Sequence, residues 1–314
     1  MEREYHVPVL LNESVNGLEI KANGDYVDVT YGGGGHSREI FSRLKSGRLF
    51  AFDQDEDAAA NVIHDDRFFF IRHNFKYIRN FLKYYEVEQV DGILADLGVS
   101  SHDFDIAERG FSFRFDGDLD MRMNRDSAQT AADIVNSYTE DQLRTVFREY
   151  GEIDNAGRLA KQLVSARNAK PVQTIEQFKE AIAPCVSRLQ ESKYLAKVFQ
   201  ALRIETNHEM DVLHEFLEQS IELLKPGGKL MLIGIPEFGR WSFSVDEARR
   251  KEICIQNVRR QNHSTEVALE MINEGIVNVD NWATHRFKLE DTKAAFDMVA
   301  GYQDGVLKAM IDFE

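Results

Sequence analysis

The sequence predicts an α/β fold in which a parallel sheet carries an inserted all-helical region. Three observations support this prediction. Short apolar runs alternate with helical periodicity over the first hundred residues, purely helical periodicity follows, and a late apolar run then comes after a Pro-Gly-Gly turn. With 314 residues, 43% hydrophobic and 29% charged, the chain is long enough for a full core and a second region.

The short apolar runs are the expected strands. A polar turn and a helical pattern come after each of the first four, which is typical of βαβ units. The fifth comes after Pro226-Gly227-Gly228, a sequence that ends a helix and starts a turn. The expected strands are 26–30, 49–52, 68–72, 92–96 and 229–235. Helical periodicity covers 131–224, and we expect a mixed segment over 245–272, a turn and helix over 284–299, and a closing strand over 307–312.

A glycine loop follows the first strand. The strand ends in Asp28, four glycines occupy 32–35, and a helix is expected to begin near Ser37. Glycine permits positive φ and close approach of a ligand to the main chain, and the first N–H groups of a helix face such a ligand. The second strand ends in Asp53, at the position where βαβ units bind ribose hydroxyls. The pattern indicates a site for a nucleoside-bearing cofactor.

Charge beside the loop favours one class of cofactor. A dinucleotide fingerprint needs G-x-G-x-x-G, but Ser37 stands where its third glycine would be, and the Asp28 carboxylate would repel a pyrophosphate. An ammonium group would be attracted instead. We therefore expect S-adenosylmethionine, with its amino group toward Asp28, its carboxylate toward the loop amides and its ribose on Asp53. The alternative is that Asp28 is a solvated acid and the glycines form only a turn.

Composition narrows the function classes. The acidic start lacks a signal peptide and no apolar run has membrane-spanning length, so a cytoplasmic protein without a membrane partner is expected. Cys185 and Cys254 are too few for a disulfide framework or a cysteine-rich zinc site, and no metal is expected. The net charge of −15 argues against broad binding to nucleic acid. A local basic face along 144–170 remains open, beside the alternative of a solvated helix surface.

Several further motifs occur in order along the chain. Asp96 ends the fourth strand at the sheet edge where ligands of open α/β sheets bind, and a loop dense in acids, arginines, glycines and aromatics follows it. The motifs are His6 to Leu10, the glycine loop with His36-Ser37-Arg38, Asp96 to Ser101, Glu108 to Phe113, Leu119 to Met123, Tyr150-Gly151-Glu152 and Phe199 to Ile204. On these residues, the chain to about Gly228 closely resembles the bacterial MraW/RsmH family of methyltransferases.

The resemblance implies a fold and an activity. The fold is a class I S-adenosylmethionine-dependent methyltransferase sheet, Rossmann-like, with an inserted all-helical domain. The expected parts are 1–103 and 209–235 for the α/β domain, 104–208 for a helical substrate-recognition domain, and 236–314 for an atypical tail. The family methylates the exocyclic N4 of a cytidine in 16S ribosomal RNA of the small subunit, which would be the partner, and a homodimer remains an open option.

Carried over to matching positions, the resemblance assigns cofactor contacts. Phe75 would cover the adenine face, although an aromatic before a helix is as often a core residue. A glutamine is usual where this chain has Asp103, so hydrogen-bond donation from that side chain is lost. Asp96 is the candidate catalytic residue, since it would accept hydrogen bonds from the cytosine amine as charge develops. The assigned cofactor contacts are Gly34, Gly35, His36, Asp53, Phe75, Asp96 and Asp103.

The last quarter departs from the family. It lacks the family's Ser/Tyr-His-Ser-Leu-Glu-Asp-Arg segment and its arginine- and serine-rich final strand. It resembles instead the carboxyl-terminal end of a zinc-dependent medium-chain polyol dehydrogenase, which indicates a hybrid chain joined between about Leu224 and Ile235. Three functions are therefore carried forward: the methyltransferase, a cofactor-binding protein without turnover, and an NAD-dependent oxidoreductase. The tail lacks both the dinucleotide loop and a zinc ligand set, which argues against the third.

Overall fold

The computed structural model of the protein describes residues 8, 10–98, 106–187, 190–234, 242–258, 264–279, 282–301 and 303–313. The chain divides into two compact units, Met1–Arg259 and Arg260–Glu314. All the expected site residues belong to the first unit.

A parallel sheet forms the centre of the first unit. Among the described residues it has six strands in the order β3-β2-β1-β4-β5-β6, and every neighbouring pair is parallel. This confirms the predicted α/β class, and each of the five expected strands is present with ends shifted by a few residues. The strands are β1 (Asp25–Asp28), β2 (Arg48–Asp53), β3 (Phe68–Arg72), β4 (Val90–Asp96), β5 (Leu224–Ile233) and β6 (Cys254–Val258).

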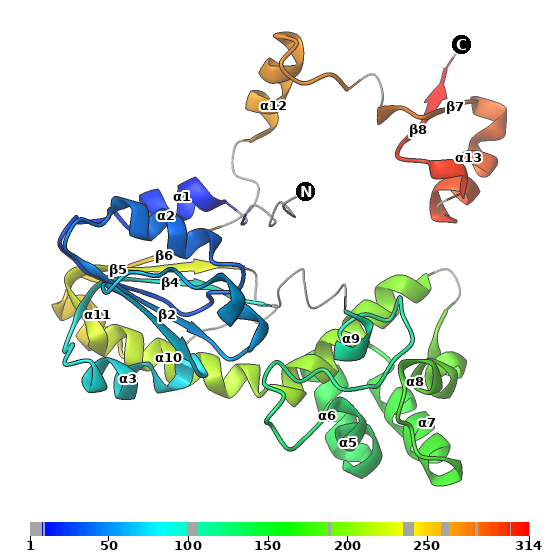
Figure 1. The fold of residues 1–314 in the computed structure, drawn as a ribbon. Helices are drawn as coiled ribbons and strands as arrows, with labels where there is room; N and C mark the ends of the chain where they lie inside the picture. Colours follow the sequence, from blue (N-terminus) through cyan, green and yellow to red (C-terminus); the bar gives the residue numbers. More distant parts are fainter. Residues whose placement is uncertain are drawn as a thin grey trace. The chain divides into compact units, whose positions relative to one another are not determined.

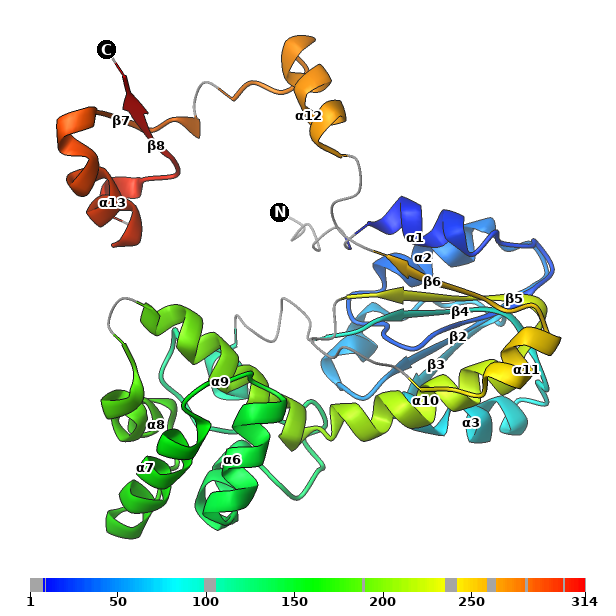
Figure 2. The ribbon, with the colours of Figure 1, turned by 180° about the vertical axis from the view of Figure 1, so that it is seen from behind.

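Helices cover both faces of this sheet, as Figures 1 and 2 show. On one face lie α1 (Leu11–Gly17) and α2 (Gly35–Arg43), and on the other α3 (Ile78–Tyr84), α10 (Glu209–Leu223) and α11 (Val245–Arg250). The strands alternate accordingly. In β2, Leu49 and Ala51 pack in the cluster with α1 and α2, whereas Phe50 and Phe52 pack in the cluster with α3 and α10. Both faces are thus buried, as expected for a parallel sheet.

The segment between β4 and β5 folds into a helical region with its own core. Its helices are α5 (Ala131–Ser137), α6 (Glu140–Glu149), α7 (Ala156–Ala169), α8 (Ile175–Ile182) and α9 (Glu191–Thr206). Thr130 and Thr139 begin α5 and α6 with capping boxes, which explains why these helices start where they do. Leu143, Phe147 and Phe178 are fully buried in a separate apolar cluster. After α9, His208 adopts φ 50° and redirects the chain into α10.

The amino-terminal edge of the sheet is held by one buried acid. The Asp91 carboxylate accepts hydrogen bonds from Lys21 Nζ at 3.1 Å, from the Asp25 N–H at 3.1 Å and from Lys225 Nζ at 2.6 Å. Burial alone would raise the pKa of Asp91, but the hydrogen bonds from Lys225 and Lys21 outweigh it and hold that pKa below its ordinary value. The starts of β1, β4 and β5 are thereby linked at the edge opposite the expected site.

The second unit contains α12 (Ser264–Asn273), β7 (His285–Lys288), α13 (Thr292–Ala300) and β8 (Ala309–Asp312). The turn-and-helix prediction for 284–299 was wrong at its start, because His285–Lys288 is a strand. The strand expected within 307–312 is present, but it pairs in parallel with β7 in a separate two-stranded sheet and does not close the main one. Among the described residues of this unit, Ala295 alone is buried. The unit therefore has almost no core of its own.

Candidate functional site

The expected site residues meet at the carboxyl edge of the sheet. Because β1, β2 and β4 are parallel, their terminal acids Asp28, Asp53 and Asp96 lie at the same edge. The strand order reverses direction between β1 and β4, and such a switch point is where open α/β sheets bind ligands. The Asp96 N–H donates to Thr30 Oγ1 at 2.7 Å, which ties the two strand ends together there.

The glycine loop has the backbone that its sequence predicts. Gly32 and Gly34 adopt φ +50° and +77°. A Cβ on Gly34 would lie 2.6 Å from the Tyr31 hydroxyl oxygen, so a side chain there would clash. Helix α2 begins at Gly35, two residues before the expected start, and no acid occupies its first turn. Its first N–H groups are therefore suited to an anionic group such as a ligand carboxylate.

Asp28 lies beneath this loop rather than open beside it. Its side chain is fully buried, one carboxylate oxygen accepts from Ser37 Oγ at 2.7 Å, and the other accepts from the Thr30 N–H at 3.0 Å. Burial raises the pKa of Asp28, and the Ser37 hydrogen bond opposes this. Helix α2, through Ser37, and the turn after β1, through Thr30, both donate to this acid. Asp28 therefore holds the glycine loop in place. Its contact with a ligand amino group stays a prediction.

Asp53 connects the loop with the second strand. One carboxylate oxygen accepts from the Gly32 N–H at 2.7 Å and the other from the Asp55 N–H at 2.9 Å. Burial raises the pKa of Asp53 to about 6, and these two hydrogen bonds only partly oppose it. Each oxygen keeps a second acceptor site, so the ionised carboxylate can still accept hydrogen bonds from vicinal hydroxyls.

Asp96 and His36 form a pair next to Asp28. The Asp96 Oδ2 lies 3.9 Å from His36 Nδ1, and the Asp96 side chain is 33% exposed whereas that of His36 is 5% exposed. Burial raises the pKa of Asp96, the neighbouring His36 opposes this, and Asp28 adds to it. Of the three strand-end acids, Asp28 is fully buried, and Asp96 is the one that has a partly exposed carboxylate beside a histidine. Such perturbed groups in a cleft are candidates for function.

A cavity of about 230 Å³ opens at this edge. From the sheet side it is lined by residues that follow strands: Thr30, Gln54, Asn74, Phe75, Leu97 and Gly98. Phe75 begins the 3₁₀ turn η2 (Phe75–Tyr77) and packs edge-on against Phe216 of α10, with ring centroids 5.2 Å apart. It therefore lines the cavity and also contacts the core, and its contact with an adenine face stays a prediction.

The other wall of the cavity comes from the insertion and the start of α10. It includes Met123, Gln200, Arg203, Asn207 and Glu209. Arg203 donates two hydrogen bonds to Glu209, at 2.8 and 3.1 Å. Burial raises the pKa of Glu209 and Arg203 opposes this. Arg203, Asn207 and Glu209 were not among the expected site residues. Arg203 lies in a quoted motif, but nothing in the sequence marked Asn207 or Glu209.

The cavity fits a nucleoside-bearing cofactor. It is lined by the aromatic ring of Phe75 and by Gln54 and Leu97, the residues that directly follow the strand-end acids Asp53 and Asp96. Asp103 lies outside the described residues.

In the described part of the chain, no group of three or more His, Cys, Asp or Glu side chains is placed to hold a metal ion. No helix there has the length and apolar character needed to cross a membrane.

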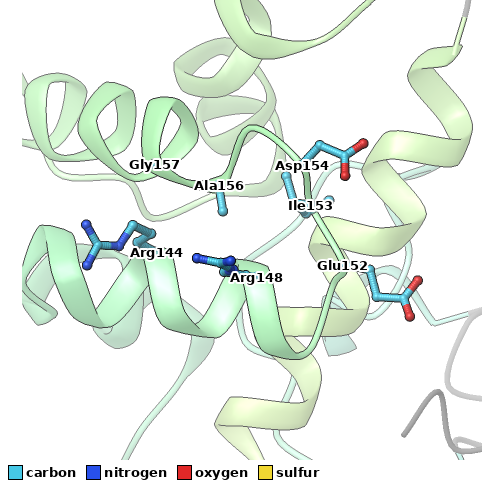
Figure 3. Close-up of a pocket in the computed structure, with 7 residues that line it drawn as sticks. All are labelled: Arg144, Arg148, Glu152, Ile153, Asp154, Ala156 and Gly157. Carbon is cyan, nitrogen blue, oxygen red and sulfur yellow. The ribbon is translucent and has the colours of Figure 1, made fainter. Parts of the chain in front are cut away.

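A second hollow, of about 410 Å³, lies in the helical region between α6 and the start of α7 (Figure 3). Arg144 and Arg148 line it from α6, and Glu152 and Asp154 from the connection that follows. The two guanidinium groups point toward the α7 side, whereas the two carboxylates are directed away from them (Figure 3). Arg144 pairs with Asp141 at 3.0 Å, and within the described residues Arg148 has no ion pair.

Comparisons with known proteins agree with this geometry. A sequence model described as the MraW methylase family matches residues 3–239. The ribosomal RNA small subunit methyltransferase H of Bacteroides thetaiotaomicron is 60% identical over 233 residues, which cover 74% of this chain and 77% of that protein. The protein of the same name from Phocaeicola vulgatus is 59% identical over 230 residues, covering 73% of this chain and 76% of that protein.

Among solved structures, alcohol dehydrogenase TADH from Thermus sp. ATN1 aligns with a TM-score of 0.35 and 9% identity, over 96% of this chain and 56% of that chain. This likeness is too weak to support a conclusion about fold or function. The family match, in contrast, covers most of the chain and ends close to the predicted junction between Leu224 and Ile235. The chain therefore belongs to the MraW methylase family.

Proposed function

We propose that this chain is an S-adenosylmethionine-dependent methyltransferase that acts on N4 of a cytidine in 16S ribosomal RNA. The observation that carries the proposal is the sheet edge at the β1/β4 switch point. There the glycine loop donates to the ribose-position acid Asp53, and the residues that follow Asp53 and Asp96 in the chain, Gln54 and Leu97, line one cavity. The membership in the MraW methylase family and the names of its relatives support the same reaction.

Each part of the cofactor has a residue that would hold it. The loop amides at Gly34 and Gly35 would bind the carboxylate, Asp53 the ribose hydroxyls, and Phe75 the adenine face. Asp28 and His36 support this arrangement from beneath, because Asp28 fixes the loop and His36 lies beside Asp96. When bound, the cofactor supplies a methyl group on a positively charged sulfur. Acids around the site favour that charge, whereas a pyrophosphate would be repelled.

Asp96 would orient the acceptor. The cytosine amine is a weak nucleophile, because its lone pair is delocalised into the ring. The enzyme must therefore align the amine nitrogen with the methyl group and accept hydrogen bonds from its N–H groups as positive charge develops on the nitrogen. The Asp96 side chain is 33% exposed, and the two residues that follow it, Leu97 and Gly98, line the cavity. The wall formed by Met123, Asn207 and Arg203 would exclude water behind the base. A base can reach this pocket only when it is unstacked from its neighbours.

The helical region would contact the RNA. With a net charge of −15, the chain needs local cationic sites to approach phosphates. Arg144 and Arg148 provide one, since they stand one turn apart on α6 and their guanidinium groups are turned away from the carboxylates of Glu152 and Asp154. We place one backbone phosphate of the substrate in this hollow. The ribosomal small subunit in the cytoplasm would be the setting.

A second candidate function follows from the tail. The family match ends at residue 239. Helix α11 and strand β6 beyond it still belong to the first unit, whereas Arg260–Glu314 form a unit that has almost no core among its described residues. If that tail replaces a segment needed at the acceptor side, the chain would bind the cofactor without turnover. Transfer of labelled methyl to small subunits from a strain lacking the modification separates the two functions, because a dead site binds cofactor and transfers no label.

The cofactor assignment is tested by thermal shift. S-adenosylmethionine or its demethylated product S-adenosylhomocysteine should raise the melting temperature. At a ligand concentration a hundred times the dissociation constant, binding stabilises the folded state by about 2.7 kcal/mol. NAD at the same concentration should leave the melting temperature unchanged. Stabilisation by NAD alone would overturn the assignment and favour the oxidoreductase.

A further inference from the structure

Arg109 is a buried arginine that joins two segments on either side of the cavity. It ends the 3₁₀ turn η3 (Ala107–Arg109), and its side chain is 3% exposed. Its Nη1 donates to Asp55 Oδ2 at 2.6 Å and lies 3.5 Å from Asp57 Oδ2. Its Nη2 donates to the backbone oxygens of Arg122 at 3.2 Å and Met123 at 3.3 Å. One guanidinium thus contacts both the loop after β2 and the loop of the insertion.

On the sheet side, these contacts lead directly to the ribose-position acid. The carboxylate of Asp55 accepts from Arg109, and the N–H of the same residue donates to Asp53 Oδ1 at 2.9 Å. Gln54, which lies between them in the chain, lines the cavity and donates to Met123 Sδ at 3.3 Å. The position of Asp53 is therefore connected to Arg109 through a single residue.

On the insertion side, the same contacts lead to the opposite wall. The Met123 N–H donates to Asn207 Oδ1 at 2.8 Å, and Asn207 Nδ2 donates to the Met121 and Arg203 oxygens, each at 2.8 Å. The Met121 N–H donates in turn to the Arg109 oxygen at 3.0 Å. Met123, Asn207 and Arg203 all line the cavity. A continuous series of hydrogen bonds therefore runs from Asp53 to this wall, and Arg109 is at its centre.

We propose that Arg109 is a positioning residue that makes the ribose-position acid and the insertion-side wall one unit, so that binding of the nucleoside cofactor orders the wall against which the acceptor base lies. This rests on the function proposed above. The planar guanidinium is required, because one fork must satisfy a carboxylate and two backbone oxygens at once. A lysine in its place could neutralise Asp55 but could not hold both loops.

The competing explanation is that Arg109 only stabilises the fold. A matched control separates the two. Arg48 holds Asp25 by two hydrogen bonds, at 3.0 and 2.9 Å, at the starts of β2 and β1, which is the opposite end of the sheet. Arg48→Lys and Arg109→Lys therefore each remove the fork of an arginine that holds an aspartate, but only Arg109 also contacts a residue that lines the cavity, Met123.

Hydrogen exchange of the full chain, read by mass spectrometry, tests the proposal without turnover. In the ligand-free protein, we expect Arg109→Lys to speed hydrogen exchange over 119–123 by about tenfold relative to wild type. Arg48→Lys should leave the exchange rate of this segment at the wild-type value. S-adenosylhomocysteine should slow exchange of wild type at both 32–35 and 119–123. In Arg109→Lys it should slow exchange only at 32–35. Equal protection of 119–123 in both proteins overturns the proposal, as does the same loss of protection in Arg48→Lys.

Methyl transfer supplies a second readout. At saturating substrates, kcat of Arg109→Lys should fall at least tenfold while the dissociation constant for S-adenosylhomocysteine changes less than about threefold, since a small misplacement costs rate rather than affinity. A kcat within about twofold of the Arg48→Lys value contradicts a positioning role. If S-adenosylhomocysteine gives no protection of 32–35 in wild type, the proposed function fails; unchanged ligand-free exchange in Arg109→Lys would by itself reject the role of Arg109.

Discussion

Cofactor affinity should depend on pH through Asp53. Ribose hydroxyls donate hydrogen bonds to an ionised carboxylate, and each Asp53 oxygen already accepts one backbone N–H. Protonation places a hydrogen on one of those oxygens and removes an acceptor. Because burial raises the pKa of Asp53 to about 6, this change falls in a range where affinity can be measured.

The size of the effect follows from that pKa. Asp53 would be about nine-tenths ionised at pH 7 and about one-tenth ionised at pH 5. If only the ionised form binds, the dissociation constant of S-adenosylhomocysteine should rise about tenfold between these two pH values. Between pH 7 and pH 8 it should stay nearly constant, because the group is already ionised.

The free energy of unfolding depends on the protonation of Asp53 in the opposite direction to cofactor affinity. In the unfolded chain the pKa of Asp53 is near its ordinary 3.8, and in the folded chain it is about 6. Between these values only the folded state holds the proton, so this group makes the fold more stable as the pH falls from 7 to 5. A loss of affinity over that range is therefore not a sign of unfolding caused by Asp53.

Isothermal titration calorimetry from pH 8 to pH 5 measures the effect, with Asp53→Asn as the control. The variant should bind weakly at every pH and show a flat profile. The reasoning is refuted if the wild-type dissociation constant changes less than twofold between pH 7 and pH 5. It is also refuted if Asp53→Asn keeps the wild-type pH dependence, which would assign the titration to Asp28 or Asp96.

Further variants test the other parts of the account. Phe75→Ala should weaken S-adenosylhomocysteine binding by about two- to tenfold in calorimetry, since an aromatic stack contributes about 0.5–1.5 kcal/mol. Asp91→Asn should lower the free energy of unfolding in urea by about 1–2 kcal/mol at pH 7, because its hydrogen bonds to two lysines weaken. That loss should shrink as the pH falls below the ordinary aspartate pKa of 3.8, since a lowered pKa contributes stability that is present in full above the ordinary value and is lost as the pH falls through the folded-state value. Arg144→Gln with Arg148→Gln should raise KM for small subunits and reduce its salt slope by about 2. Removal of 260–314 should shift the melting temperature by less than about 2 °C, because that unit buries almost no apolar surface.

Each of these has a control and an outcome that would contradict it. Tyr84→Ala removes an exposed aromatic and should leave cofactor affinity unchanged; an equal loss in both variants would reject the role of Phe75. A constant difference between Asp91→Asn and wild type down to pH 3 would reject the ionic explanation. Arg249→Gln with Arg250→Gln removes two exposed arginines from α11, and the same rise in KM there would mean non-specific charge. A fall of more than about 5 °C on truncation would show that the tail supports the first unit.

The sheet was predictable because its strands are apolar on both faces. Residues such as Phe50 and Leu94 are buried whichever way they point, so a short apolar run marks a strand without knowledge of its neighbours. Strand β6 was not predicted. It lies at the sheet edge, has the polar residues Gln256 and Asn257, and is only partly buried, so its pattern is weak. The strand at His285–Lys288 was missed for the same reason.

The placement of the candidate site residues was predictable at strand ends and the glycine loop, where residue type and spacing determine the backbone, while their contacts with a ligand stay predictions. The burial of Asp28 was not predictable, because it depends on Ser37 and Thr30 folding back over the carboxylate. The role of Arg109 was not predictable either. The motif around it was noted, but its partner Asp55 is 54 positions away and only the folded chain brings them together.

The most direct test of the central claim is the identity of the methylated nucleoside. Small subunits from a strain lacking the modification would be incubated with the full chain and S-adenosylmethionine carrying a labelled methyl, and their 16S RNA digested and analysed by mass spectrometry. The account predicts that the label is found in N4-methylcytidine. Label in another nucleoside, or none although S-adenosylhomocysteine binds, would contradict it.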